Sequence, residues 1–362
     1  MILSRSFMLN KIAGTYLFYG EDGIGRWQTA ICYTALLNCE QPKIIDEKQK
    51  LAIPCQQCRN CQNIFSLNFE GLQFAVPIPP HNNKLDKAID FTNEVLAIKR
   101  SEPFRIIKAA SSVNIPIAVA REIRKTLSLK ATQGIKRTVI FYQMEKMKTS
   151  SADALLKLIE EPPEDTVVIL ITGKPDTLLP TIQSRSQKIK IDKNQPQDIE
   201  NYLIEKYKVS PKRAKLLSKI SKGSLGRAID MIETTPDETD SKRAVIFLLF
   251  KSLFVDKSPD MLGHMNEVLN FRDRGEAEEL LRLWQLLVRD CANFAVSNDA
   301  DEIINIDFSV ELQKLAVYFS RPQIALDMVE HIKNTLADLR RNVHIQGALM
   351  ALALKLKSVI GE

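Results

Sequence analysis

The sequence predicts an α/β fold built on a parallel sheet in its first half, followed by two helical regions. Residues 1–192 alternate short apolar strands with amphipathic helices, a pattern typical of a parallel sheet with helices on both faces. A cysteine cluster at 39–61 interrupts this alternation, residues 193–237 show short helices, and residues 238–362 show almost only helical periodicity. We therefore expect three domains, with a metal-binding module inserted in the first and a small helical lid as the second.

A phosphate-binding loop is predicted near the N-terminus. The stretch 15–19 is short, aromatic and apolar, as in a buried strand, and 28–37 has helical spacing. Between them stand Gly20, Gly23 and Gly25, and a phosphate loop requires this order of strand, glycine-rich loop and helix. We expect its backbone to keep the phosphate-binding shape.

The two residues after the loop glycines are unsuited to ATP hydrolysis. An active phosphate loop continues with a lysine that reaches the phosphates and a serine or threonine that holds magnesium. Here these positions are Arg26 and Trp27. Arginine lacks the compact ammonium group, and an indole cannot bind magnesium. The loop is therefore predicted to be degenerate.

Four cysteines predict a metal site. Cys55, Cys58 and Cys61 are separated from one another by two intervening residues, which suits a tight turn around one ion, and Cys39 lies upstream as a fourth ligand. Four thiolates without a nearby histidine fit a closed, structural zinc site. An iron–sulfur cluster and unligated thiols are the alternatives, and zinc is favoured. The remaining cysteines are expected in the core: Cys32 and Cys291.

The acidic pair of an ATPase is also missing. Such an enzyme needs carboxylates at the end of a second strand, and the best candidate strand is 138–142. The expected positions hold Tyr142 and Gln143, neither of which replaces a carboxylate. Glu145 follows two residues later, where its side chain need not point at the phosphates. The metal-handling groups are thus absent from both places.

The other segments follow from local pattern. Residues 76–84 are rich in proline and asparagine and are expected to form a loop, and residues 233–240 to form a polar linker. Trp284 is expected in the helical core. The remaining predicted elements are strands at 166–172 and 188–191, a helix that begins at 211, and helices at 85–98, 198–207, 224–232, 244–254, 277–294, 310–319, 323–339 and 343–359.

The composition is that of an ordinary globular chain. With 362 residues, 45% hydrophobic and 26% charged, it excludes collagen-like and disordered classes. The net charge of +6 permits contact with nucleic acid without requiring it. No apolar run approaches the roughly 18–20 residues of a membrane span, and no secretion signal is evident. We expect a cytoplasmic protein without membrane contact.

In combination these motifs resemble the bacterial DNA polymerase III clamp-loader family, whose members are AAA+ proteins. The cysteine cluster follows the phosphate-loop helix, the segment 151–163 is similar to the family's helix ending in Leu-Glu-Glu-Pro-Pro, and 179–186 resembles its Ser-Arg-Cys motif. Trp284 and Arg341 lie in segments that look like the family's collar domain. The resemblance implies an AAA+-like first domain, a helical lid and an all-α collar, and it covers the chain except an insertion around 76–100.

Within this family the gamma and tau subunits hydrolyse ATP, and the delta-prime subunit has degenerate motifs. Because its phosphate loop is degenerate, this sequence resembles the delta-prime subunit more than the gamma and tau subunits. Ser186 replaces the cysteine of Ser-Arg-Cys, and the nucleotide-sensing arginine of active members falls on Gly226, one position before Arg227. The resemblance therefore implies a non-hydrolysing subunit of the DNA polymerase III holoenzyme, a DNA-directed DNA polymerase; the alternative is an active gamma/tau-like ATPase.

The resemblance makes Arg185, with Ser184 beside it in the motif, the candidate catalytic position. It implies that Arg185 reaches the γ-phosphate of ATP bound in a neighbouring subunit, as an arginine finger. The alternative is a surface ion pair. The implied partners are the gamma/tau and delta subunits, the sliding clamp and primer–template DNA, with zinc as cofactor and without ATP on this chain.

Basic residues in the first domain could contact DNA phosphates, or form a solvated face: Lys108, Arg121, Arg124 and Lys125. A third hypothesis is a stand-alone, zinc-containing DNA-binding factor.

Overall fold

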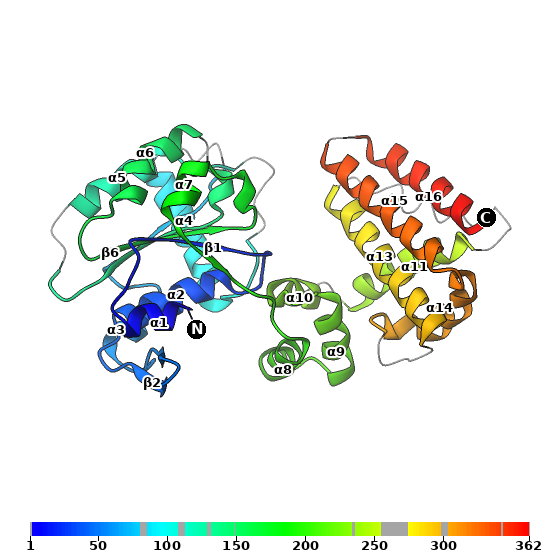
Figure 1. Ribbon diagram of the computed structural model, residues 1–362, viewed down its shortest axis with the longest axis horizontal. Helices are drawn as coiled ribbons and strands as arrows, with labels where there is room; N and C mark the ends of the chain where they lie inside the picture. The colour runs from blue at the N-terminus through cyan, green and yellow to red at the C-terminus, as the bar shows by residue number, and fades with distance from the viewer. Residues whose placement is uncertain are drawn as a thin grey trace. The chain divides into compact units, whose positions relative to one another are not determined.

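The computed structural model describes residues 2–79, 85–107, 113–128, 132–147, 149–233, 236–254, 274–297, 303–341 and 343–361 (Figure 1). Contacts divide the chain into two compact units. The first comprises Met1–Tyr207 with Ser221–Asp230, and the second Lys208–Ile220 with Met231–Glu362. The domain boundaries near residues 192 and 237 stay a prediction.

The first unit is built on a parallel sheet of five strands in the order β4-β5-β6-β1-β7. β1 lies between β6 and β7, and Leu17 pairs with Leu170 on one side and Lys188 on the other. The strands are β1 (Thr15–Tyr19), β4 (Leu72–Ala75), β5 (Arg137–Phe141), β6 (Thr166–Thr172) and β7 (Gln187–Lys190). The predicted parallel sheet is confirmed.

Both faces of the sheet are covered because successive strand residues point to opposite sides. On one face of the sheet, Tyr16 and Phe18 share a core with four helices: α1 (Ile2–Met8), α2 (Arg26–Leu37), α3 (Arg59–Phe65) and α4 (Leu85–Ser101). Leu17 packs in the opposite core with α5 (Ile117–Ser128), α6 (Thr149–Glu160) and α7 (Pro180–Arg185). Figure 1 shows α5, α6 and α7 on one side of β1 and α1 and α2 on the other.

Three strands lie outside the predicted elements. β4 is a strand of the main sheet, and β2 (Lys43–Asp46) and β3 (Leu51–Ile53) form a separate antiparallel hairpin within the cysteine region. The predicted loop at 76–84 is non-helical as far as it is described, with a bridge from Ile78 to Asn114, and 80–84 lie outside the described residues. The predicted helix at 85–98 is confirmed as α4.

The helices after the sheet agree with the sequence except at one point. They are α8 (Pro196–Tyr207), α9 (Pro211–Ile220) and α10 (Leu225–Glu233). The prediction of a polar linker at 233–240 is wrong, since α11 begins at Pro236. In the first turn of a helix the backbone N–H groups have no intrahelical partner, so proline loses nothing there by lacking one. Pro236, which was interpreted as a turn residue, therefore begins a helix.

The regular elements described in the second unit are all helices. Besides α9, they include α11 (Pro236–Ser252), α13 (Arg274–Val296), α14 (Ser309–Leu315), α15 (Pro322–Arg340) and α16 (Ile345–Gly361). Short 3₁₀ turns occur in both units, at Met144–Lys146, Pro175–Thr177, Ile306–Phe308 and Ala316–Phe319. Among the described helices, none has the length and apolar character needed to cross a membrane.

Trp284 is the largest fully buried side chain of the second unit and confirms the predicted core position. It is 1% exposed on α13, packs near Phe250, and its indole N–H donates to the Ile246 carbonyl at 3.3 Å.

Replacing Trp284 by alanine is expected to destabilise the second unit by about 3–5 kcal/mol, because the cavity adds to the lost burial of the indole. Thermal unfolding measured by calorimetry tests this. Val317→Ala is the control, since Val317 is 70% exposed and should change the unfolding temperature little. Equal shifts for both variants would contradict the core role of Trp284.

Candidate functional site

The predicted glycine loop lies between β1 and α2, as expected. Gly23 and Gly25 have φ of 76° and 110°, in the left-handed region that favours glycine. A Cβ on Gly23 would lie 2.5 Å from Ser224 Oγ and 3.0 Å from Gly226 Cα, so a side chain there is also excluded by contact. Gly20, with φ of 151°, begins the loop.

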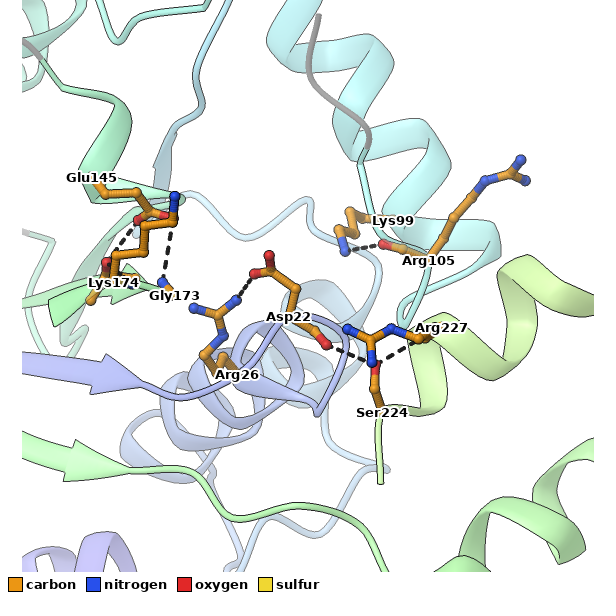
Figure 2. Close-up of polar contacts among 10 residues, drawn as sticks. Asp22, Arg26, Lys99, Arg105, Glu145, Gly173, Lys174, Ser224 and Arg227 are labelled. Atoms are coloured by element: carbon orange, nitrogen blue, oxygen red, sulfur yellow. Dashed lines mark hydrogen bonds and ion pairs between the residues drawn. The ribbon is translucent and has the colours of Figure 1, made fainter. Parts of the chain in front are cut away.

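Arg26 is turned inward and is paired within the loop. Its side chain is 4% exposed, and its Nη2 forms an ion pair with Asp22 (Figure 2). Nη1 is buried and has no hydrogen-bond partner among the described residues. A Cβ on Gly173 would lie 3.5 Å from this Nη1 and 3.6 Å from Glu145 Oε1. Arg26, Asp22 and Glu145 thus surround Gly173, and the sequence did not indicate Asp22 as a partner.

Glu145 is held at the end of β6. Its Oε2 accepts from Thr172 Oγ1 at 2.7 Å, and its Oε1 accepts from Gly173 N at 3.4 Å. The sequence left open where this carboxylate points. It lies close to the loop arginine, but its oxygens are already engaged by the strand end (Figure 2).

Trp27 and Tyr142, which replace the two metal-handling positions, pack against each other. Their ring centroids are 5.4 Å apart, edge to face, and Trp27 stacks on Phe74 at 5.0 Å. The Lys99 ammonium lies 5.6 Å from the Trp27 ring and 5.4 Å from the Tyr142 ring, within the range of cation–π attraction. The side chains at these two positions are therefore engaged in aromatic and cation–π packing.

Lys99 comes from α4, in the segment that the family resemblance left unmatched. It is 4% exposed, and its Nζ donates to the carbonyls of Arg105 at 2.6 Å and Pro103 at 3.3 Å (Figure 2). Burial, together with the charge of Arg26, lowers the pKa of Lys99 to about 8. Sequence reasoning missed this residue because no local signal connects position 99 with position 27.

Two other segments cover the loop. Gly226 N donates to Gly23 O at 2.9 Å, and Ser224 Oγ donates to Asp22 O at 2.7 Å. A Cβ on Gly226 would lie only 2.5 Å from Phe104 O and 2.9 Å from Gly23 Cα. The start of α10 and the segment after α4 therefore lie directly against the phosphate loop, with Gly226 at the predicted sensor position.

The predicted cysteine cluster is assembled. The sulfur atoms of Cys39, Cys55, Cys58 and Cys61 all lie within 4.8 Å of one another. Backbone N–H groups point at them, from Cys55 to Cys39 Sγ at 3.2 Å and from Cys58 to Cys55 Sγ at 3.2 Å. Donation from Cys58 and Gln57 N–H lowers the pKa of Cys55 to about 6, favouring the thiolate. This group fits a metal ion that takes sulfur ligands.

The other two cysteines are separate from the cluster. Cys291 is buried in the second unit, as predicted. The prediction that Cys32 is a core residue is wrong, because Cys32 is exposed on α2. Its neighbours Ile31 and Tyr33 supply the face of this helix that packs on the sheet.

Arg185 is the last residue of α7 and is exposed, with its side chain 43% accessible. Its Nε forms an ion pair with Glu160 Oε1 at 3.1 Å. The Ser184 hydroxyl donates to Thr181 O at 3.1 Å, within the same helix. Arg185 lies two residues before Gln187, which pairs with Tyr16 near the start of β1, whereas the phosphate loop follows the end of β1. The two sites therefore lie at opposite edges of the sheet.

The protein family described as DNA polymerase III, delta subunit, matches residues 1–195, more than half of the chain. The chain belongs to this family. The matched region contains the phosphate loop, the cysteine cluster and Arg185. Members of this DNA polymerase III family are clamp-loader subunits that act in DNA replication, and the family resemblance stated from the sequence is confirmed.

Individual relatives agree with the family. The DNA polymerase III subunit delta′ of Bacillus subtilis (strain 168) is 26% identical over 357 residues, 98% of this chain and 94% of that protein. Subunit delta′ of Pseudomonas aeruginosa is 29% identical over 173 residues, 48% of this chain and 41% of that protein. Subunit tau of B. subtilis is 26% identical over 186 residues, 51% of this chain and 26% of that protein.

Proposed function

We propose that this clamp-loader subunit is of the delta-prime type: it does not hydrolyse ATP and supplies Arg185 to ATP bound by a neighbouring subunit. In this role it helps to load the sliding clamp onto primed DNA. Its partners are the gamma/tau ATPase subunits, the delta subunit, the clamp and primer–template DNA, in the cytoplasm. Full-length similarity to a delta′ subunit supports this assignment.

The position of Arg185 carries the proposal. β1 has five residues at roughly 3.3 Å each, so about 15 Å of strand separates the Arg185 edge from the chain's own phosphate loop. An arginine side chain cannot cover that distance around the sheet. An exposed guanidinium so placed is available to a phosphate on another molecule and not to one bound by its own loop.

The packing around Trp27 supports a loop that has become structural. Trp27 and Tyr142, at the positions where an ATPase would bind magnesium, pack together with Lys99. Gly226, at the start of α10, contacts Gly23 of the loop. An active gamma/tau-like ATPase is the second candidate, favoured by the retained loop glycines and the similarity to tau. Such an enzyme would need the aromatic packing to open.

We further propose that the cysteine cluster holds structural zinc, since four thiolates without histidine suit that ion best. Residues 1–192 would then form an AAA+-like domain with its zinc module at 39–61, residues 193–237 a lid, and residues 238–362 a collar that joins the subunits. The helical second unit supports the collar.

The purified chain is expected to show no ATP turnover with magnesium, and Arg26→Lys with Trp27→Thr should not create it. The restored loop would still lack carboxylates at Tyr142 and Gln143. Phosphate release and binding of a fluorescent ATP analogue measure this. A gamma/tau subunit assayed in parallel is the positive control. Micromolar nucleotide affinity together with turnover by the unmodified chain would establish the gamma/tau-like alternative instead.

A further inference from the structure

The Arg185 guanidinium is paired with a carboxylate. Within the part of the chain that the structure describes, its ion-pair partner is Glu160, whose Oε1 lies 3.1 Å from Nε. Both side chains are partly exposed, at 43% and 36%. Glu160 is the last residue of α6, and Arg185 is the last residue of α7. The ion pair therefore joins the C-terminal ends of two helices.

Both helix ends are fastened to the start of β1. Thr15 Oγ1 donates to the Ile159 carbonyl at 2.8 Å, in a buried contact directly before Glu160. A Cβ on Gly14 would lie 2.9 Å from Pro162 Cγ, so the chain after α6 lies tightly against the residue before β1. The carboxylate therefore projects from a fixed backbone position.

The backbone of Arg185 is fixed in the same way. Ser186 is buried, and its hydroxyl donates to the Ile182 carbonyl at 2.7 Å, closing the last turn of α7. The following residue, Gln187, pairs with Tyr16 of β1. The backbone next to Glu160 is therefore bound to Thr15, and the backbone close to Arg185 is bound to Tyr16. Because Thr15 and Tyr16 are adjacent in β1, the two side chains project from nearby fixed positions.

The contact through Nε has a chemical consequence. A guanidinium is planar, and its two terminal Nη groups form the fork that binds two oxygens of a phosphate. Since the Glu160 carboxylate comes closest to Arg185 at Nε, the contact is centred beside this fork, and it restricts rotation of the long side chain.

From this geometry, and resting on the proposed arginine finger, we propose that Glu160 is a positioning residue that holds Arg185 ready for a phosphate of the neighbouring subunit. Since a finger acts on charge that develops in the transition state, the effect falls on kcat and not on KM for ATP. An exposed ion pair contributes modestly, so the loss expected on removing the carboxylate is about two- to fivefold. A carboxylate that instead competed with the phosphate would produce a gain.

The test uses a clamp loader reconstituted from the complete chain and its partner subunits, with clamp and primed DNA present. Glu160→Gln should lower kcat about two- to fivefold with unchanged KM, Glu160→Asp should recover part of the loss, and Glu161→Gln, on the exposed neighbouring residue, is the matched control. In an Arg185→Ala background, Glu160→Gln should have no further effect, because coupled residues are non-additive. Unfolding temperatures of the variants report any structural damage.

The outcomes separate the two proposals. If Arg185→Ala leaves turnover unchanged, the arginine finger itself is refuted. If Arg185→Ala lowers turnover but Glu160→Gln leaves it unchanged, raises it, or lowers it equally in the Arg185→Ala background, only the role of Glu160 is overturned.

Discussion

Replacing Arg185 by alanine is expected to lower ATP turnover at the adjoining site of the assembled clamp loader by about 10³–10⁵-fold, the range measured for well-placed arginine fingers. The guanidinium of an arginine finger stabilises charge that develops on the transferring phosphoryl group. The fold should be retained, because Arg185 is exposed and its pair with Glu160 is a surface ion pair.

Phosphate release by the reconstituted loader, with clamp and primed DNA, measures this loss. Arg185→Lys keeps the charge but not the planar fork and should recover little. Lys188→Ala removes an exposed cation on β7, three residues away, and is the matched control for charge on this surface. Turnover that is insensitive to Arg185→Ala in a correctly assembled complex would leave Arg185 as a surface ion pair.

Removing one cysteine of the cluster is expected to have the second large effect. Cys58→Ser should abolish metal binding and unfold the segment that contains β2, β3 and α3, because Cys58 belongs to the proposed metal site and is also the N-cap of α3. Structural zinc sites contribute on the order of 10 kcal/mol of folding free energy, so the module should not fold around three thiolates.

Elemental analysis and thermal unfolding of the purified chain measure this effect. One zinc per chain is expected in the unmodified protein and in Cys32→Ser, whose thiol is exposed on α2 away from the cluster. Iron with visible absorbance would identify an iron–sulfur cluster instead. Metal-free protein whose stability is the same with and without Cys58→Ser would show that the thiols are unligated.

Several features of the site follow from short segments of sequence. The strand, loop and helix around Gly20, Gly23 and Gly25 were predictable because glycines and apolar periodicity act locally. The cysteine site was predictable because the spacing of Cys55, Cys58 and Cys61 brings three sulfurs to one turn, and Cys39 was available upstream as a fourth. Local sequence also misled at 233–240, where a linker was predicted. Proline is common both in turns and at the first position of a helix, and Pro236 begins α11.

Four residues could be judged without a structure: Arg26, Trp27, Tyr142 and Gln143 stand where an ATPase of this kind would have a lysine, a hydroxyl and two carboxylates, and residue type does not depend on conformation. The contacts that these side chains make could be known only from the folded chain. Lys99 reaches Trp27 and Tyr142 from α4, Gly226 closes on Gly23, and Glu160 meets Arg185 at the edge of the sheet opposite the loop. These contacts join residues far apart in the chain, and only packing of the helices on the shared strands brings them within a few ångströms.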